Sequence, residues 1–433
     1  MDNINKFNRN ILSFSLMLIP LWWILGIKFF IFQVTSLYFL ISNFNKDYKL
    51  DIDIKRIMIF ICLYIISTII AIINNPLDVT GVDRLTPLYL ISYWIMGIFI
   101  ILGFQYKDQI EDKFLLNIFK ATYILGIFSI ILLILGIITW HIRGPYLIEN
   151  NGLFFNILPN NIKFGIFDKL TKLDYMYIDW INGIKTYRYN GFYVYPVAAA
   201  MGTVYILIYS LVYLNCNKEL LKSKKKICYI IYFIMLGSIV YFAKSRMVII
   251  GSIISIIITS FIYIINKDNY KKVLIYTTLL IFILSIISIN FGLIEKVLEM
   301  RASSNSDRLF VYEKAINTFL KHPIFGVGVR YFIEESIIPV GSHSTYIGAL
   351  MRSGIIGFIG ILLFVLNTFI SIYNNKKYII NNKSKVIWIA TSFLFILSSL
   401  WMITEDIDWP HIVAFFYFIN TSIIYQFKRI KYN

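Results

Sequence analysis

The sequence predicts an all-α, polytopic transmembrane helix bundle that forms a single integral membrane domain over residues 1–433. Of the 433 residues, 58% are hydrophobic and only 15% are charged, and the mean hydropathy is +0.71. A soluble domain has about 45–50% apolar and about 25% charged residues. Apolar runs of spanning length recur along the whole chain, and lysine and arginine concentrate in alternate loops. These observations exclude a water-soluble protein and a disordered chain.

The apolar runs define the predicted spans, since a membrane-crossing helix needs about 20 mainly apolar residues. About twelve runs meet that criterion. Eleven spans result if the first two runs form one tilted helix, because Gly26 and Lys28 divide that stretch. The predicted spans are 11–27, 29–44, 57–73, 87–104, 114–140, 194–214, 227–243, 247–266, 273–294, 345–373, 386–403 and 412–427.

The basic residues indicate the orientation, because cytoplasmic loops carry an excess of lysine and arginine. With both termini cytoplasmic, the inner segments hold 23 Lys+Arg and 9 Asp+Glu. The short outer loops hold four cations: Lys28, Arg84, Lys244 and Arg246. The net charge of +17 therefore records topology and requires no nucleic-acid partner.

Two outer loops are long, residues 141–193 and 295–344, and loops of this length are usually functional. The first is rich in aromatic residues, which suit stacking on sugar rings or an interfacial aromatic belt. The second contains a predicted amphipathic helix, capped by Ser304 or Ser306 and ended at Pro323. Its apolar face is formed by Leu309, Tyr312, Ile316 and Phe319.

No motif for a metal or a cofactor is present in the sequence. The histidines show no i, i+3 or i, i+4 pair typical of a zinc site, and they are His141, His322, His343 and His411. The three cysteines form no CxxC pair. Nucleotide-binding fingerprints are absent as well. We therefore expect no cofactor, and we expect chemistry on the outer face.

Three arginines lie at the predicted outer surface. Arg188 precedes the sixth span, Arg246 lies in the turn between the seventh and eighth, and Arg308 opens the loop helix. Guanidinium groups that converge there suit a membrane-bound pyrophosphate, which they can grip bidentately. For each arginine alone, snorkelling near lipid headgroups is an equally good explanation.

His343 is the candidate acid–base group, since an unperturbed histidine with a pKa of ~6.5 exchanges protons near neutral pH. Gly354 follows eleven residues later, about three helical turns, which predicts one shared helix face. A histidine that only caps a helix start is the alternative for a residue standing alone. Lys120 and Arg352 lie inside apolar runs, and Arg352 is interpreted as a structural or headgroup-facing charge.

Four short segments between residues 306 and 357 carry a resemblance to a known family. They are Asp307-Arg308-Leu-Phe-Val-Tyr312-Glu-Lys-Ala315, His322-Pro323-Ile-Phe325-Gly326-Val-Gly328, His343-Ser-Thr-Tyr346 and Gly354-Ile-Ile-Gly357. In order and spacing they resemble the O-antigen ligase and O-antigen polymerase superfamily. Arg188-Tyr-Asn-Gly191-Phe192 and Ser245-Arg246 look like two further family positions. The chain departs from the family pattern at Ser344, where asparagine is frequent, and at Arg352, where an acidic residue is frequent.

The resemblance implies a metal-independent, inverting glycosyltransferase of the cytoplasmic (inner) membrane, active on its outer face. Its donor would be an oligosaccharide linked to a polyprenyl pyrophosphate of the undecaprenyl type. His343 would be catalytic, with pyrophosphate bound by Arg188 and Arg246, and with Arg308 in the same cluster or shaping the site. Supporting positions would be Tyr312, Gly326, Gly328 and Gly354.

Within the family the sequence favours a polymerase of repeat units over a ligase that attaches finished glycan to lipid A-core or another acceptor. The aromatic outer loops suit recognition of one particular repeat unit. A flippase for lipid-linked sugar is the competing class, and an assembly scaffold is a third. The expected partners are the lipid-linked donor, a glycan acceptor and the bilayer, with other polysaccharide assembly proteins as further candidates.

Overall fold

The computed structural model describes residues 10–44, 49–74, 85–107, 110–143, 152–157, 173, 176–181, 184–217, 226–264, 302–333, 336–408 and 412–431. Helices dominate these residues, and the strands form three two-stranded sheets. The all-α prediction is confirmed for this part of the chain.

Eight helices among the described residues are long and apolar enough to cross a membrane. Their formation follows from continuous apolar sequence of about 20 residues. They are α5 (Ile52–Asn74), α6 (Leu85–Tyr106), α7 (Asp112–Arg143), α10 (Pro196–Cys216), α12 (Lys226–Ala243), α13 (Arg246–Ile264), α17 (Thr345–Asn375) and α18 (Asn382–Trp401). The chain is a multi-pass membrane protein.

The remaining predicted spans have different outcomes. The first two correspond to three short helices, α2 (Ile11–Met17), α3 (Ile19–Leu25) and α4 (Lys28–Asn43). Gly26, in the left-handed conformation with φ 74°, ends α3, so the alternative of one tilted helix is wrong. The predicted span 273–294 lies outside the described residues.

The last helix, α19 (Ile412–Gln426), lies at the centre of the bundle. All its residues are buried, as expected for a helix that is apolar on every side. Phe416 stacks on Tyr205 of α10 with ring centroids 5.3 Å apart, and Phe418 meets Trp94 of α6 edge-on at 5.6 Å. Aromatic packing therefore joins α19 to two neighbouring spans.

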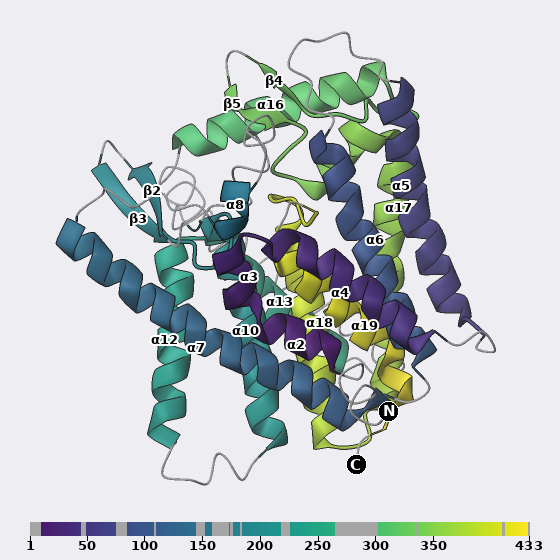
Figure 1. Ribbon diagram of the computed structural model, residues 1–433. Coiled ribbons are helices and arrows are strands. Elements are labelled where there is room, and N and C mark those ends of the chain that lie inside the picture. The colour runs from purple at the N-terminus through teal and green to yellow at the C-terminus, as the bar shows by residue number, and fades with distance from the viewer. Residues whose placement is uncertain are drawn as a thin grey trace.

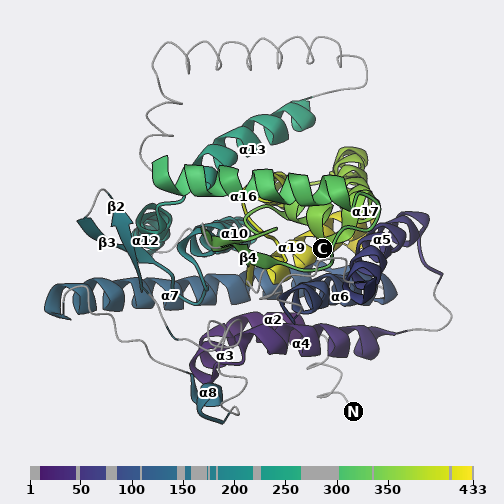
Figure 2. The ribbon, with the colours of Figure 1, turned by 90° about the horizontal axis from the view of Figure 1, so that it is seen from above.

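One end of the bundle carries the elements of the two long loops (Figure 1). There α16 (Ala302–Lys321) lies across the helix ends, as Figure 2 shows from above. The hairpin strands β2 (Met176–Ile181), β3 (Ile184–Tyr189), β4 (Tyr331–Ile333) and β5 (Ser336–Val340) are at the same end, as is the short α8 (Leu153–Ile157).

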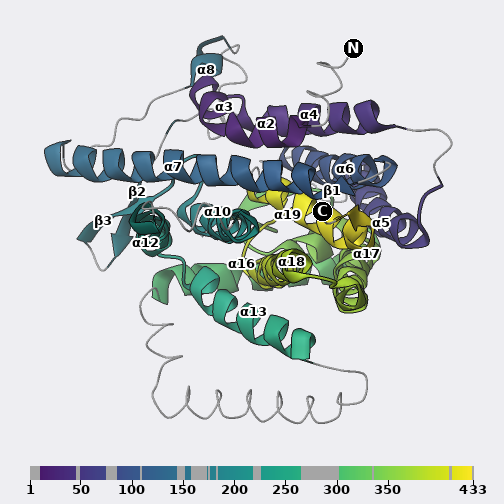
Figure 3. The ribbon, with the colours of Figure 1, turned by 90° about the horizontal axis from the view of Figure 1, so that it is seen from below.

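The opposite end of the bundle is held together by polar contacts. Strand β1 (Ile110–Glu111) pairs in parallel with β6 (Ile430–Lys431), which follows the 3-10 turn Phe427–Arg429. Lys383 Nζ lies 2.9 Å from Asp112 Oδ2. Figure 3, seen from below, shows α10, α12, α17 and α18 nearly end-on.

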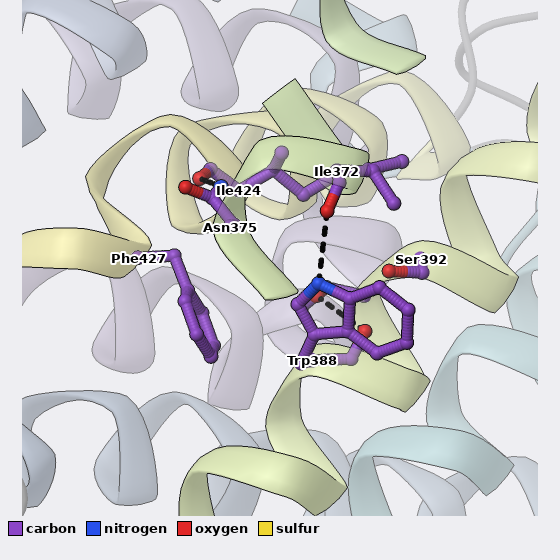
Figure 4. A pocket seen from close by; sticks show the side chains of 7 residues that line it. Ile372, Asn375, Trp388, Ser392, Ile424 and Phe427 are labelled. Atoms are coloured by element: carbon purple, nitrogen blue, oxygen red, sulfur yellow. Dashed lines mark hydrogen bonds between the residues drawn. The ribbon is translucent and has the colours of Figure 1, made fainter. Parts of the chain in front are cut away.

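A small gap near this end is part of the packed interior. It lies between α17, α18 and α19 and is shown in Figure 4. Trp388 Nε1 donates to Ile372 O at 3.0 Å, and Asn375 Nδ2 donates to Ile424 O. Its lining is mainly apolar, and Trp388, Asn375 and Thr391 donate to helix carbonyls, so we assign it no ligand.

The predicted helix of the second long loop is confirmed as α16, with corrections to its start and to its buried face. It begins at Ala302, so Ser304 and Ser306 lie inside it and do not cap it, and Arg308 lies in its second turn instead of opening it. It ends one residue before His322, as the following Pro323 predicts. The predicted apolar face is partly wrong: Leu309 and Ile316 are exposed, and the buried face is formed by Val311 and Ala315, with Tyr312 and Phe319 half-buried beside them.

Candidate functional site

Helix α17 is broken at Gly354, which has non-helical φ 61° and ψ −164°. The turn that contains Pro323 fills the break. Ile355 N donates to Pro323 O at 2.8 Å, and Val327 N donates to Met351 O at 2.9 Å. The inserted turn therefore replaces the hydrogen bonds that the helix loses at its kink.

The glycines of both segments permit this close approach. A β-carbon on Gly354 would collide with the backbone of Ile324, and one on Gly326 would collide with Met351 O. Gly328 has φ 69°, and a β-carbon there would collide with the backbone of α5 at Ile72. The predicted supporting residues Gly326, Gly328 and Gly354 thus form one packing unit.

His343 lies before α17, and the predicted helix face shared with Gly354 is wrong. The helix begins at Thr345 and is capped by Ser344, whose Oγ accepts from Ile347 N at 3.2 Å. With His343 outside the helix and Gly354 at its break, helical spacing does not relate them. Serine and asparagine are both good N-caps, so Ser344 keeps the capping function.

The imidazole of His343 lies at a junction of three elements. Its side chain is 34% exposed, and Nδ1 is 3.6 Å from Glu405 Oε2. The backbone of His343 has φ 60°. Its N–H donates to Asp406 Oδ2 at 3.0 Å, and its carbonyl accepts from Tyr312 Oη. Tyr312, a predicted supporting residue, thus contacts the backbone of His343.

Arg308 reaches the same junction from α16. Its Nη2 donates to Glu405 Oε1 at 2.8 Å, and its Nη1 donates to Thr404 O at 3.2 Å. Burial alone would raise the pKa of Glu405, but the adjacent Arg308 guanidinium, followed by His343, outweighs burial and lowers the pKa to about 2. Glu405 is thus a carboxylate that orients both predicted site residues.

Glu405 belongs to a loop of residues 402–408, here called the acidic loop, which connects α18 to the segment before α19. Its carboxylates face arginines from three different elements. Asp406 Oδ2 lies 2.9 Å from Arg330 Nη2, and Asp408 Oδ2 lies 3.4 Å from Arg352 Nη2. Asp408 Oδ2 also accepts from Tyr64 Oη at 3.0 Å and Trp94 Nε1 at 3.2 Å.

The acidic loop was not singled out by the sequence analysis. The available signal was three acids within four positions, in a chain with only 24 acidic residues. The loop also decides between the two interpretations of Arg352, which is fully buried and paired with Asp408. Arg352 is therefore structural and does not face headgroups. Lys120 is exposed on α7.

Arg188 binds the turn between α12 and α13, and Arg246 follows that turn directly. Arg188 is buried on β3, and its Nε and Nη2 donate to Ala243 O at 3.0 and 2.8 Å. Lys244 in this turn has φ 51°, and Arg246 begins α13. Two of the predicted site arginines are thus brought to one turn.

The aromatic residues of the first long loop pack within the protein where they are described. Tyr187 lies between Trp140 and Phe242, with centroid distances of 4.8 and 5.7 Å. Tyr189 is buried, and its Oη donates to Ser129 O at 3.0 Å. These rings anchor the β2–β3 hairpin to the spans.

The structure therefore assembles two groups at one end of the bundle: His343, Arg308 and Tyr312 around the acidic loop, and Arg188 with the turn that carries Arg246 (Figure 1). No curated protein matches the chain. The O-antigen ligase family model matches residues 231–362, from within α12 to within α17. The matched segment includes Arg246, Arg308 and His343, whereas Arg188 and the acidic loop lie outside it. The chain thus carries an O-antigen ligase family domain over residues 231–362.

Proposed function

We propose that this protein is a membrane glycosyltransferase that polymerises polyprenyl-pyrophosphate-linked oligosaccharide repeat units on the outer side of the cytoplasmic membrane. Members of the matched family are lipid-linked glycan transferases. The observation that carries the proposal is the contact of His343 with Glu405, which is itself paired with Arg308. A partly exposed histidine oriented by a buried carboxylate suits the activation of a hydroxyl group.

In the proposed reaction, His343 accepts the proton of an acceptor sugar hydroxyl. With Nδ1 directed to Glu405, Nε2 is the nitrogen that serves as base. The hydroxyl oxygen attacks the anomeric carbon of the donor and forms the new glycosidic bond. The bond from that carbon to the pyrophosphate oxygen breaks, and its electron pair leaves with the pyrophosphate. Inversion at the anomeric carbon follows from this single displacement.

Arg246 and Arg188 are the proposed binding groups for the pyrophosphate. Arg246 begins α13, where a helix N-terminus also favours an anion. Arg188 would contribute to binding at the same turn, which its guanidinium holds through a hydrogen bond to Ala243 O. Arg308 is already neutralised by Glu405, so of its two predicted roles we favour shaping the site. Stabilisation of the leaving pyrophosphate is electrostatic.

The test is a transfer assay with purified protein and a lipid-pyrophosphate oligosaccharide. His343→Ala is expected to reduce transfer by about 100-fold or more, the usual contribution of a positioned general base. His141→Ala, at the exposed end of α7, is the matched control and should retain transfer. Transfer by His343→Ala at the wild-type rate would overturn the proposal, as would lipid translocation without transfer.

A ligase is the second candidate, because the matched family model is described as O-antigen ligase. The two functions differ in the acceptor. Deletion of a polymerase leaves single repeat units on the final acceptor, whereas deletion of a ligase removes all attached glycan. Analysis of the glycan in a deletion strain distinguishes them.

A further inference from the structure

His343 adopts a backbone conformation that its side chain disfavours. Its φ is 60°, and among the described residues only Lys244 shares a positive φ without being glycine. A residue with a β-carbon is strained in this region and keeps the conformation only where its surroundings impose it. The turn at residues 341–343 must therefore be held by specific contacts.

Two contacts hold the backbone of His343, one on each side. Tyr312 Oη donates to its carbonyl, and Asp406 Oδ2 accepts from its N–H at 3.0 Å. Asp406 comes from the acidic loop, 63 residues along the chain. The backbone of His343 is thus held by a carboxylate from a distant part of the sequence, bonded to its N–H.

Asp406 is in turn fixed by Arg330, which precedes β4. The same Oδ2 atom lies 2.9 Å from Arg330 Nη2, and both residues are buried, with relative exposures of 6% and 1%. Burial lowers the pKa of Arg330, and the charge of Asp406 opposes that shift. A buried ion pair is costly to desolvate and is weak evidence for stability. The ion pair between Arg330 and Asp406 is therefore considered for its effect on the geometry of the 341–343 turn and not for its effect on stability.

We propose that Arg330 and Asp406 are positioning residues that fix the imidazole of His343 through its backbone N–H. Arg330 sets the direction of the Asp406 carboxylate, and the carboxylate holds His343 in the left-handed conformation from which its side chain meets Glu405. The rate effect of this arrangement rests on the proposed transferase function. The effect on the conformation of His343 does not.

Two double variants isolate the hydrogen bond from the charges. Arg330→Met with Asp406→Asn removes both charges but keeps an oxygen that can accept from His343 N–H. Arg330→Met with Asp406→Leu removes the charges and the acceptor within nearly the same volume. Replacing both partners avoids leaving one buried charge alone, which is the destabilising change. Equal melting temperatures of the two variants establish that both fold.

We expect the leucine variant to have a kcat about 10- to 100-fold below that of the asparagine variant, with a similar KM for the lipid-linked donor. A small displacement of a catalytic group has effects of this size. We also expect the rate at which diethyl pyrocarbonate modifies His343, measured by mass spectrometry, to differ between the two variants. Equal kcat and equal modification rates would overturn the proposal.

The two readouts separate this inference from the proposed function. An active His343→Ala variant would refute the proposed function, while the modification rates of the two double variants would still decide the positioning role. An inactive His343→Ala variant combined with equal double variants would refute the positioning role alone.

Discussion

Arg308, Arg330 and Arg352 each face one carboxylate of the acidic loop, at 2.8, 2.9 and 3.4 Å. Three guanidiniums and three carboxylates leave this cluster without a net positive charge. At the residue scale, this balance leaves Arg308 without the excess positive charge that an anionic leaving group needs, in keeping with the proposal that Arg308 shapes the site.

Glu405 gives the first prediction at this scale. Glu405→Gln removes the charge that pairs with Arg308 and the group that orients His343, so we expect transfer to fall about 10- to 100-fold. The measurement is the transfer rate of purified protein. Glu313→Gln, which changes an exposed acidic residue of α16, is the control and should retain the wild-type rate. A wild-type rate for Glu405→Gln would remove Glu405 from the mechanism.

The lowered pKa of Glu405 also predicts a pH dependence. Because the pKa falls from its ordinary 4.5 to about 2, the ionised carboxylate contributes stability that is fully present above about pH 4.5. That contribution is lost as the pH falls towards 2. Acid unfolding of wild type and Glu405→Gln should therefore differ in slope in this window, and similar slopes would contradict the pairing with Arg308.

The residues of the site differ in how far they could be predicted. Arg308, Tyr312 and His343 lie within 36 positions and carry a recognisable spacing. Their partners Glu405 and Asp406 lie more than 60 positions further on. The pairing of these acids with the arginines depends on how α18 returns to α16, which no local pattern encodes.

At the element scale, the spans follow from hydropathy, but the break in α17 does not. Glycine is frequent in transmembrane helices, so Gly354 inside an apolar run is compatible with an unbroken span. The break exists because the turn at residues 323–328 supplies hydrogen bonds to the opened helix. Such an insertion joins segments about 30 residues apart, so it cannot be predicted from the periodicity of apolar residues.

The broken helix gives the prediction at the element scale. Gly354→Ala places a β-carbon against the backbone of Ile324, and at φ 61° and ψ −164°, a conformation essentially restricted to glycine, the backbone alone costs about 1–3 kcal/mol. We expect a clearly lower melting temperature in detergent. Gly237→Ala is the matched control, since nothing lies within 4 Å of a β-carbon there, and alanine is the better helix former.

The control should therefore melt at or slightly above the wild-type temperature. If Gly354→Ala had the same melting temperature as Gly237→Ala, the insertion of the turn at residues 323–328 into the break of α17 would not be essential for the fold.

At the scale of the whole molecule, residues assigned to the same side by charge meet at the same end of the bundle. Lys383 pairs with Asp112, and Arg429 Nη2 donates to Lys107 O at 2.7 Å. All four residues lie in segments that the predicted spans place on the cytoplasmic side. The residues around His343 lie at the other end with α16 (Figure 1). The alternation of loops is thus consistent with the positive-inside prediction.

Orientation gives the prediction at the scale of the whole molecule, and labelling from one side tests it. In a chain with Cys62, Cys216 and Cys228 replaced by serine, Leu320→Cys introduces a thiol on α16, where the leucine is 65% exposed. Asn382→Cys introduces one at the exposed start of α18, at the opposite end of the bundle.

A maleimide that does not cross membranes should label Leu320→Cys in intact spheroplasts and should label Asn382→Cys only after lysis. This outcome is expected because the segments predicted to be cytoplasmic, which include the start of α18, carry 23 lysines and arginines. It would also place His343 on the side where a lipid-linked glycan can meet its acceptor. The reverse labelling pattern would put the site in the cytoplasm and would refute both the orientation and the proposed outer-face chemistry.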